Sequence, residues 1–175
     1  MRGVVAGLAA AVASFSAKEF LQGLIAEQST YERNMLRTQA IIDATGASAG
    51  FTAEQLRLQA RELALGTLQS VEGVERAQQI LMTFRNVTGD IFVRATEQAT
   101  NLSVAMNTDL NSAIKQLGKA LDEPARGLEG LREAGVSFSD SQKEVIQSLI
   151  EAGEVATAQA LILDEIAGKA LLAGT

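Results

Sequence analysis

The chain has 175 residues, of which 47% are hydrophobic and 4% aromatic, and its formal net charge is −6. It contains no cysteine and no histidine, which excludes a disulfide framework and thiolate metal sites and removes the most common general base. An acidic balance without any block of Lys and Arg argues against nucleic-acid binding. Abundant alanine and a single proline favour helix. We therefore expect a helical chain of about one domain that is not an enzyme.

The N-terminal segment has two interpretations. Met1 and Arg2 precede the apolar run GVVAGLAAAVASF, and a basic start followed by a short apolar run is typical of a secretory signal peptide. The run is too short to span a bilayer, which needs about 20 apolar residues. Because it continues without a break residue into the next helical pattern, it also fits an Ala-rich helix that packs on its neighbours.

The following segment, residues 16–43, carries an apolar stripe with a 3-4-3-4 rhythm. The stripe consists of Leu21, Leu24, Gln28, Tyr31, Met35, Thr38 and Ile42. Such spacing is typical of a weak coiled-coil seam, and equally of one face of a helix in a bundle. The sequence predicts a first region, residues 1–44, made of the Ala-rich helix and this amphipathic helix.

Glycines and capping residues divide the middle of the chain into further helices. The loop TGASAG (45–50) ends the amphipathic helix, and Thr52 with Gln55 has the spacing of a capping box. Later helices are expected to start near Ser70, after Gly89, and at one of Asn107, Thr108 and Asp109. The expected inward positions are Leu56, Ala60, Leu63, Val74, Ala77, Leu81, Phe84, Ile91, Ala95, Ala99, Leu102, Ala113, Ile114, Leu117 and Leu121.

The sequence of the C-terminal third predicts three short helices. Pro124 suits a first helical turn, and the carboxylates of Asp122 and Glu123 suit its positive end. That helix is expected over residues 125–134 and ends at Gly135 as a left-handed cap. Ser139 and Gln142 form a second capping box, and Gly153 turns the chain into the last helix. The expected buried positions are Val145, Ile146, Leu149, Ile150, Val155, Ala158, Ile162 and Ile166.

No stretch alternates with period two, so no sheet is predicted. The connections are short, which favours antiparallel neighbours. We expect an all-α fold: a compact bundle of about seven or eight antiparallel helices, with residues 45–175 as a compact domain that forms one structural unit with the first region.

No candidate catalytic, cofactor-binding or metal-binding residues emerge. Asp122 and Glu123 point in different directions on a helix and are better explained as capping residues. Ser137, Ser139 and Asp140 have no histidine partner to activate a nucleophile. The remaining acidic side chains, Glu72, Glu75, Asp164 and Glu165, are expected on solvated helix faces, and Arg94 with Glu97 is expected to form a surface ion pair.

Three sequence segments carry a resemblance to a known family. In order they are LGKALDEPARGLEGL (117–131), GVSFSDSQK (135–143) and IEAGEVATAQALIL (150–163). Together they resemble the tape measure proteins of long-tailed bacteriophages and prophages, most strongly over residues 114–163. A weaker likeness extends through TQAIIDATGASAGFTAEQLRLQA (38–60) and residues 76–106. The shared segments are turn and capping signals, so the resemblance carries over no site residues.

The resemblance implies a structural module of a tail tape measure protein, acting in tail assembly and length determination. It implies the tail tube, the tail assembly chaperone and the tail tip proteins as partners, with self-association also open, and the tail lumen of the virion as the location after assembly in the bacterial cytoplasm. It leaves membrane contact open. Turns about every fifteen residues depart from a continuous ruler helix, so the segment is expected to be a compact module of a longer tape. The competing hypothesis is an exported helical binding protein with an N-terminal signal peptide.

Overall fold

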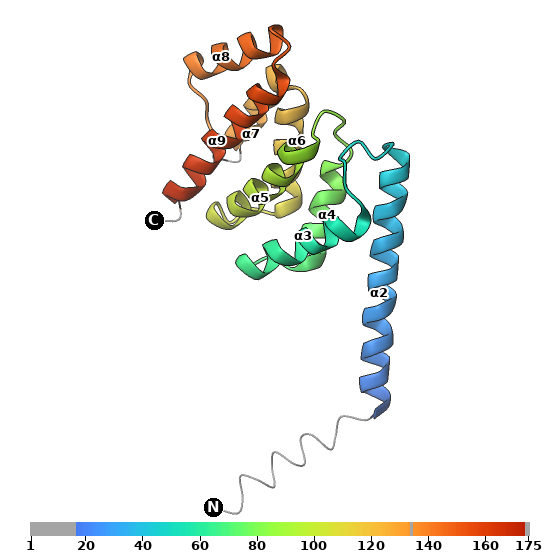
Figure 1. Cartoon of the computed structure of the whole chain (residues 1–175). Helices are drawn as coiled ribbons and strands as arrows, with labels where there is room; N and C mark the ends of the chain where they lie inside the picture. Colours follow the sequence, from blue (N-terminus) through green and yellow to red (C-terminus); the bar gives the residue numbers. More distant parts are fainter. Residues whose placement is uncertain (1–16, 134, 174–175) are drawn as a thin grey trace, which may run out of the picture. The chain divides into compact units, whose positions relative to one another are not determined.

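The computed structural model describes residues 17–133 and 135–173, in which every regular element is an α-helix (Figure 1). The helices are α2 (Ala17–Ala44), α3 (Ala53–Gly66), α4 (Val71–Leu81), α5 (Gly89–Ala105), α6 (Leu110–Asp122), α7 (Pro124–Glu133), α8 (Asp140–Glu151) and α9 (Val155–Ala173). The described residues contain no strand, which confirms the all-α prediction. The predicted signal peptide or Ala-rich helix before residue 17 lies outside the described residues.

The chain divides into two compact units, Met1–Arg37 and Thr38–Thr175, with the boundary inside α2. The end of α2 belongs to the second unit, where Thr38 and Ile42 are buried. The Thr38 hydroxyl accepts a 3.1 Å hydrogen bond from Nε2 of Gln79 in α4, and both side chains are buried. This bond joins the last turns of α2 to α4 within the second unit.

Of the predicted stripe residues of α2 whose side chains the structure describes, only Thr38 and Ile42 are buried. Gln28 and Tyr31 are exposed and Met35 is half-buried. The side chains of Leu21 and Leu24 lie outside the described residues.

Both predicted capping boxes are present. The Thr52 hydroxyl accepts from the backbone N–H of Gln55 at 3.2 Å, and Oε1 of Gln55 accepts from the backbone N–H of Thr52 at 2.9 Å. Ser139 and Gln142 exchange the same two bonds at the start of α8, at 3.2 and 2.8 Å. The further N-caps are Ser70 for α4 and Asp109 for α6. These local hydrogen bonds explain why the helices begin where the sequence predicts.

Substituting Ser139 by alanine is expected to lower the free energy of unfolding by about 1 kcal/mol, because one backbone N–H of the first turn of α8 loses its acceptor. Denaturant unfolding of the full chain measures this change. Ser141→Ala alters an exposed serine of the same turn and is expected to leave stability nearly unchanged. Equal effects of the two substitutions would contradict the capping role.

Helices α5 and α6 lie at the centre of the Thr38–Thr175 unit. Helix α6 packs on α4, α5 and α7, whereas α9 packs on α5 and α8, and α3 packs on α4. Phe92 of α5 is fully buried, and its ring centroid lies 5.6 Å from that of Phe51. The predicted inward positions that are buried are Leu56, Ala60, Val74, Ala77, Leu81, Ala95, Ala99, Leu102, Ala113, Ile114, Leu117, Leu121, Ile146, Ala158, Ile162 and Ile166.

Two predicted inward positions are wrong. Val145 is 50% exposed and Val155 is 37% exposed. Helix α8 packs on α9 and has only a thin contact with α7, so it buries a narrow face centred on Ile146. Val155 lies in the first turn of α9, next to exposed turn residues. The half-buried positions among those predicted are Leu63, Phe84, Ile91, Leu149 and Ile150.

Helix α7 begins at Pro124, one residue earlier than predicted. Proline has no N–H to leave unpaired in a first turn and its fixed φ suits the helix, so it starts α7 at no cost. Gly135 follows the helix with a φ of 81°, as predicted for a left-handed cap. The turn after α8 uses Gly153 in the same conformation, also with a φ of 81°.

Helices α6 and α7 are in backbone contact through Gly127. A Cβ atom on Gly127 would lie 2.5 Å from the Lys119 carbonyl oxygen and 2.6 Å from the Ala120 nitrogen, and would also overlap the Ala120 Cα. A Cβ atom on Gly118 of α6 would overlap the ring of Phe84. These two helical glycines therefore set how closely α6 approaches its neighbours.

A polar cluster joins the α4–α5 connection to α6 and α9. The carboxylate of Asp122 accepts a 3.0 Å hydrogen bond from the backbone N–H of Asn86. The buried Gln159 of α9 donates from Nε2 to the carbonyl oxygens of Asn86 and Leu121, at 2.8 and 2.9 Å. Asp122, which the sequence predicts as a capping residue, thus also contacts the α4–α5 connection, and no local sequence signal reveals this contact.

The charged side chains also differ from the prediction. Glu75 is 6% exposed, and its Oε1 lies 3.0 Å from Nη1 of Arg57 in α3, so it is not on a solvated face. Arg94 pairs with Asp164 of α9 at 2.5 Å, rather than with Glu97. Both corrections follow from helix packing, because each arginine reaches an acidic residue on the helix beside it.

Candidate functional site

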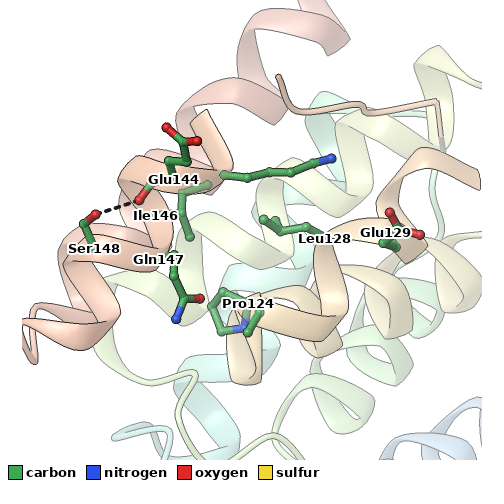
Figure 2. Close-up of a pocket in the computed structure, with 9 residues that line it drawn as sticks. Pro124, Leu128, Glu129, Glu144, Ile146, Gln147 and Ser148 are labelled. Atoms are coloured by element: carbon green, nitrogen blue, oxygen red, sulfur yellow. Dashed lines mark hydrogen bonds between the residues drawn. The ribbon is translucent and has the colours of Figure 1, made fainter. Parts of the chain in front are cut away.

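A groove lies between α7 and α8 and has a volume of about 610 Å³. We call it the α7–α8 groove; its lining residues are Pro124, Ala125, Leu128, Glu129, Lys143, Glu144, Ile146, Gln147 and Ser148. Figure 2 shows Pro124 and Leu128 of α7 across the gap from Ile146 and Gln147 of α8, with the carboxylates of Glu129 and Glu144 at its borders. A groove of this size with an apolar floor and a few polar groups is typical of a binding surface.

The floor of the groove is apolar and its border is charged. Pro124, Leu128 and Ile146 are buried, so they provide a firm apolar base. Nζ of Lys143 lies 3.6 Å from Oδ1 of Asp140. Glu129 and Glu144 form no salt bridge with another described residue, which leaves an excess of negative charge along the border.

The groove arises because α7 and α8 are each attached to a different helix. Helix α7 packs on α6, and its Gly127 lies close to the α6 backbone. Helix α8 packs on α9. The connecting segment is attached at Val136 and Phe138, both buried. Each of the two helices thus makes most of its contacts with a helix other than its neighbour across the groove.

The residues considered for catalysis from the sequence have structural roles here. Ser139 caps α8, the backbone oxygen of Ser137 accepts a hydrogen bond from Nζ of Lys169, and Asp140 lies beside Lys143. Asp122 and Glu123 diverge: Asp122 binds Asn86, whereas Glu123 is exposed, 3.9 Å from Arg126. They do not form a carboxylate pair.

The described residues contain neither a cluster of metal-binding side chains nor a helix able to span a membrane. Across residues 17–133 and 135–173, no group of three or more acidic side chains is placed to hold a metal ion. Within the same residues, none of the helices combines the length and apolar character needed to cross a membrane.

Sequence reasoning did not identify the groove. The residues of its floor carry the ordinary spacing of a buried helix face, and Glu129 and Glu144 look like solvated charges. The separation of α7 from α8 depends on contacts between distant segments, so no local pattern contains it.

Comparisons with known proteins leave the family open. No protein-family model matches the chain, and neither a curated protein nor a solved structure matches it.

Proposed function

We propose that this chain is a compact structural module of a bacteriophage or prophage tail tape measure protein, with a role in tail assembly and length determination. The observation that carries the proposal is the resemblance over residues 114–163. This range runs from α6 into α9 and includes residues that start these helices or bring them close together. Gly118, Pro124 and Gly127 lie in the first of the resembling segments, and Ser139 and Gln142 in the second. The resembling segments thus have a shared physical role, which is to build a specific helical module.

The fold supports a module in preference to a ruler. A ruler needs a continuous helix, whose rise of about 1.5 Å per residue converts chain length into tube length. In the described part of the Thr38–Thr175 unit, the end of α2 is followed by seven short helices, α3 to α9, and most of the turns between them carry a left-handed residue or a helix cap. We therefore assign this unit to a folded part of the tape that contacts other tail components, with the tail tube, the assembly chaperone and the tip proteins as candidate partners.

Mass spectrometry of purified tail particles tests the proposal. Particles would be induced from the bacterial strain that encodes the chain and separated from tail-less heads. We expect peptides from residues 38–175 in the tail fraction and not in the heads, and a reading frame flanked by genes for tail proteins.

The same experiment tests the exported binding protein, which the basic and apolar N-terminus favours. Export predicts recovery from the periplasm or medium, with a mature N-terminus near residues 13–17, where a signal peptidase would cut. Recovery of the chain there, and its absence from tails, would contradict the proposed tail function.

A further inference from the structure

A long segment of the Thr38–Thr175 unit is attached to it by a single buried side chain. Phe138 and Ala158 are buried, and of residues 139–157 between them, all of which the structure describes, only Ile146 is buried. We call residues 139–157 the strap; it comprises α8, the turn that follows and the start of α9. The half-buried residues of the strap are Gln142, Leu149 and Ile150.

The central helices of this unit are attached far more firmly than the strap. Helices α5 and α6 each bury seven side chains, and α6 packs on α4, α5 and α7. Helix α8 packs on α9 and has only a thin contact with α7, and Figure 1 shows it at the edge of the unit. Segments with few buried apolar contacts open at a lower free energy than the core, whose amides become exposed only on global unfolding.

One polar contact adds to the attachment by Ile146. Nε2 of Gln142 donates a 2.6 Å hydrogen bond to Oε2 of Glu165 in α9. Both side chains are half-buried, so water replaces this bond at little cost when the strap detaches. The other side-chain hydrogen bonds and salt bridges described for the strap join strap residues to one another, and they do not oppose its detachment.

We infer that the strap opens as a separate cooperative unit while the rest of the Thr38–Thr175 unit stays folded. When Ile146 leaves its buried position, α8 loses its packing on α9. An isolated helix of 12 residues, the length of α8, is marginal in water, so α8 loses its helical structure when it detaches. Phe138 and Ala158 stay buried on either side and hold the two ends of the open strap.

Opening of the strap removes one side of the α7–α8 groove. The residues that line the groove from α8 are Lys143, Glu144, Ile146, Gln147 and Ser148. The groove is therefore formed only while the strap is closed. A molecule bound in the groove would shift the equilibrium toward the closed strap, because it binds that state and not the open one. The inference rests on the contacts of the fold and does not depend on the tail function.

Native-state amide hydrogen exchange of the full chain tests the inference. In the wild type, we expect the amides of residues 144–151 to exchange at least about tenfold more slowly than in an unstructured peptide. We also expect them to exchange at least about a hundredfold faster, relative to their intrinsic rates, than the most protected amides of α5 and α6. A complete lack of protection in α8, or protection equal to that of α5 and α6, would overturn the inference.

Two matched substitutions separate opening of the strap from global unfolding. Ile146→Val and Ile114→Val each remove one methylene group from a fully buried isoleucine, in the strap and in α6, and each is expected to favour opening about fivefold. Ile146→Val weakens the native state relative to every open state, so exchange is expected to accelerate in α8, α5 and α6 alike. Ile114 stays buried while the strap is open, so Ile114→Val is expected to accelerate exchange in α5 and α6 and to leave α8 unchanged.

The two variants also provide the results that would contradict a separate strap. If Ile114→Val accelerated exchange in α8 as much as in α6, α8 would open only together with the whole unit. If Ile146→Val left exchange in α8 unchanged, Ile146 would not hold the strap closed. Circular dichroism confirms beforehand that both variants have the helix content of the wild type.

Discussion

Substituting Gly127 by alanine is expected to lower the free energy of unfolding by about 3 kcal/mol, at the upper end of what overpacking usually costs. The added methyl group would meet the backbone of Lys119 and Ala120 in α6, and backbone atoms cannot move aside as the end of a side chain can. Helices α6 and α7 would have to separate, and the contacts along their interface would loosen. Urea unfolding followed by circular dichroism measures the loss.

Gly130 provides a matched control in the same helix. A Cβ atom there would have nothing within 4 Å, so Gly130→Ala is expected to stabilise the chain by about 0.5 to 1 kcal/mol, because alanine loses less backbone entropy in a helix. The two alanines are thus expected to act in opposite directions. If Gly127→Ala were neutral or stabilising, the close approach of α6 and α7 would be contradicted.

Substituting Gln159 by leucine is expected to cost about 2 kcal/mol. Leucine has a similar size, but it cannot donate to the carbonyl oxygens of Leu121 and Asn86, which receive both of the Gln159 Nε2 bonds. A buried carbonyl that loses its donor carries the cost of its own desolvation. The α4–α5 connection would also lose one of its attachments, so faster amide exchange is expected around Asn86.

Gln147→Leu is the control, because Gln147 is exposed and bonds to Glu151 on the same helix. Its effect is expected to stay within about 0.5 kcal/mol. A Gln159→Leu variant as stable as the Gln147→Leu variant, with unchanged exchange at Asn86, would show that the cluster does not hold the connection.

The elements predicted best from the sequence are those governed by local hydrogen bonds. Thr52 with Gln55 and Ser139 with Gln142 form their capping boxes as expected. The positive φ of Gly135 and Gly153 follows from the same kind of signal. These features depend on a few neighbouring residues, so a single sequence contains most of the information.

The roles of the glycines inside helices could not be predicted from the local sequence. In the sequence, Gly118 and Gly127 are weak points in their helices, since glycine lowers helix stability. In the structure, they are the positions where a neighbour leaves no room for a side chain. Which glycine makes a close contact and which, like Gly130, faces open space depends on how the helices pack.

The same limit explains the errors in burial and charge. The sequence predicts that Glu75 is on the surface, but the packing of α3 on α4 places Arg57 beside it and buries it. The sequence predicts that Val145 is buried, but α8 packs mainly on α9 and leaves Val145 exposed. The α7–α8 groove depends on the same arrangement. Each feature is set by contacts between segments far apart in the chain, which periodicity does not encode.

Tail length in electron micrographs tests the central claim most directly: that this chain is a folded module of a tape measure protein and not part of its measuring rod. In phage particles that carry an in-frame duplication of codons 38–175, we expect tails of wild-type length. A duplicated rod segment of that size would lengthen the tube by about 210 Å. Duplication of an equally long uninterrupted helical segment elsewhere in the same protein serves as the control and is expected to produce that increase. An increase of about 210 Å from the duplicated module itself would contradict the account.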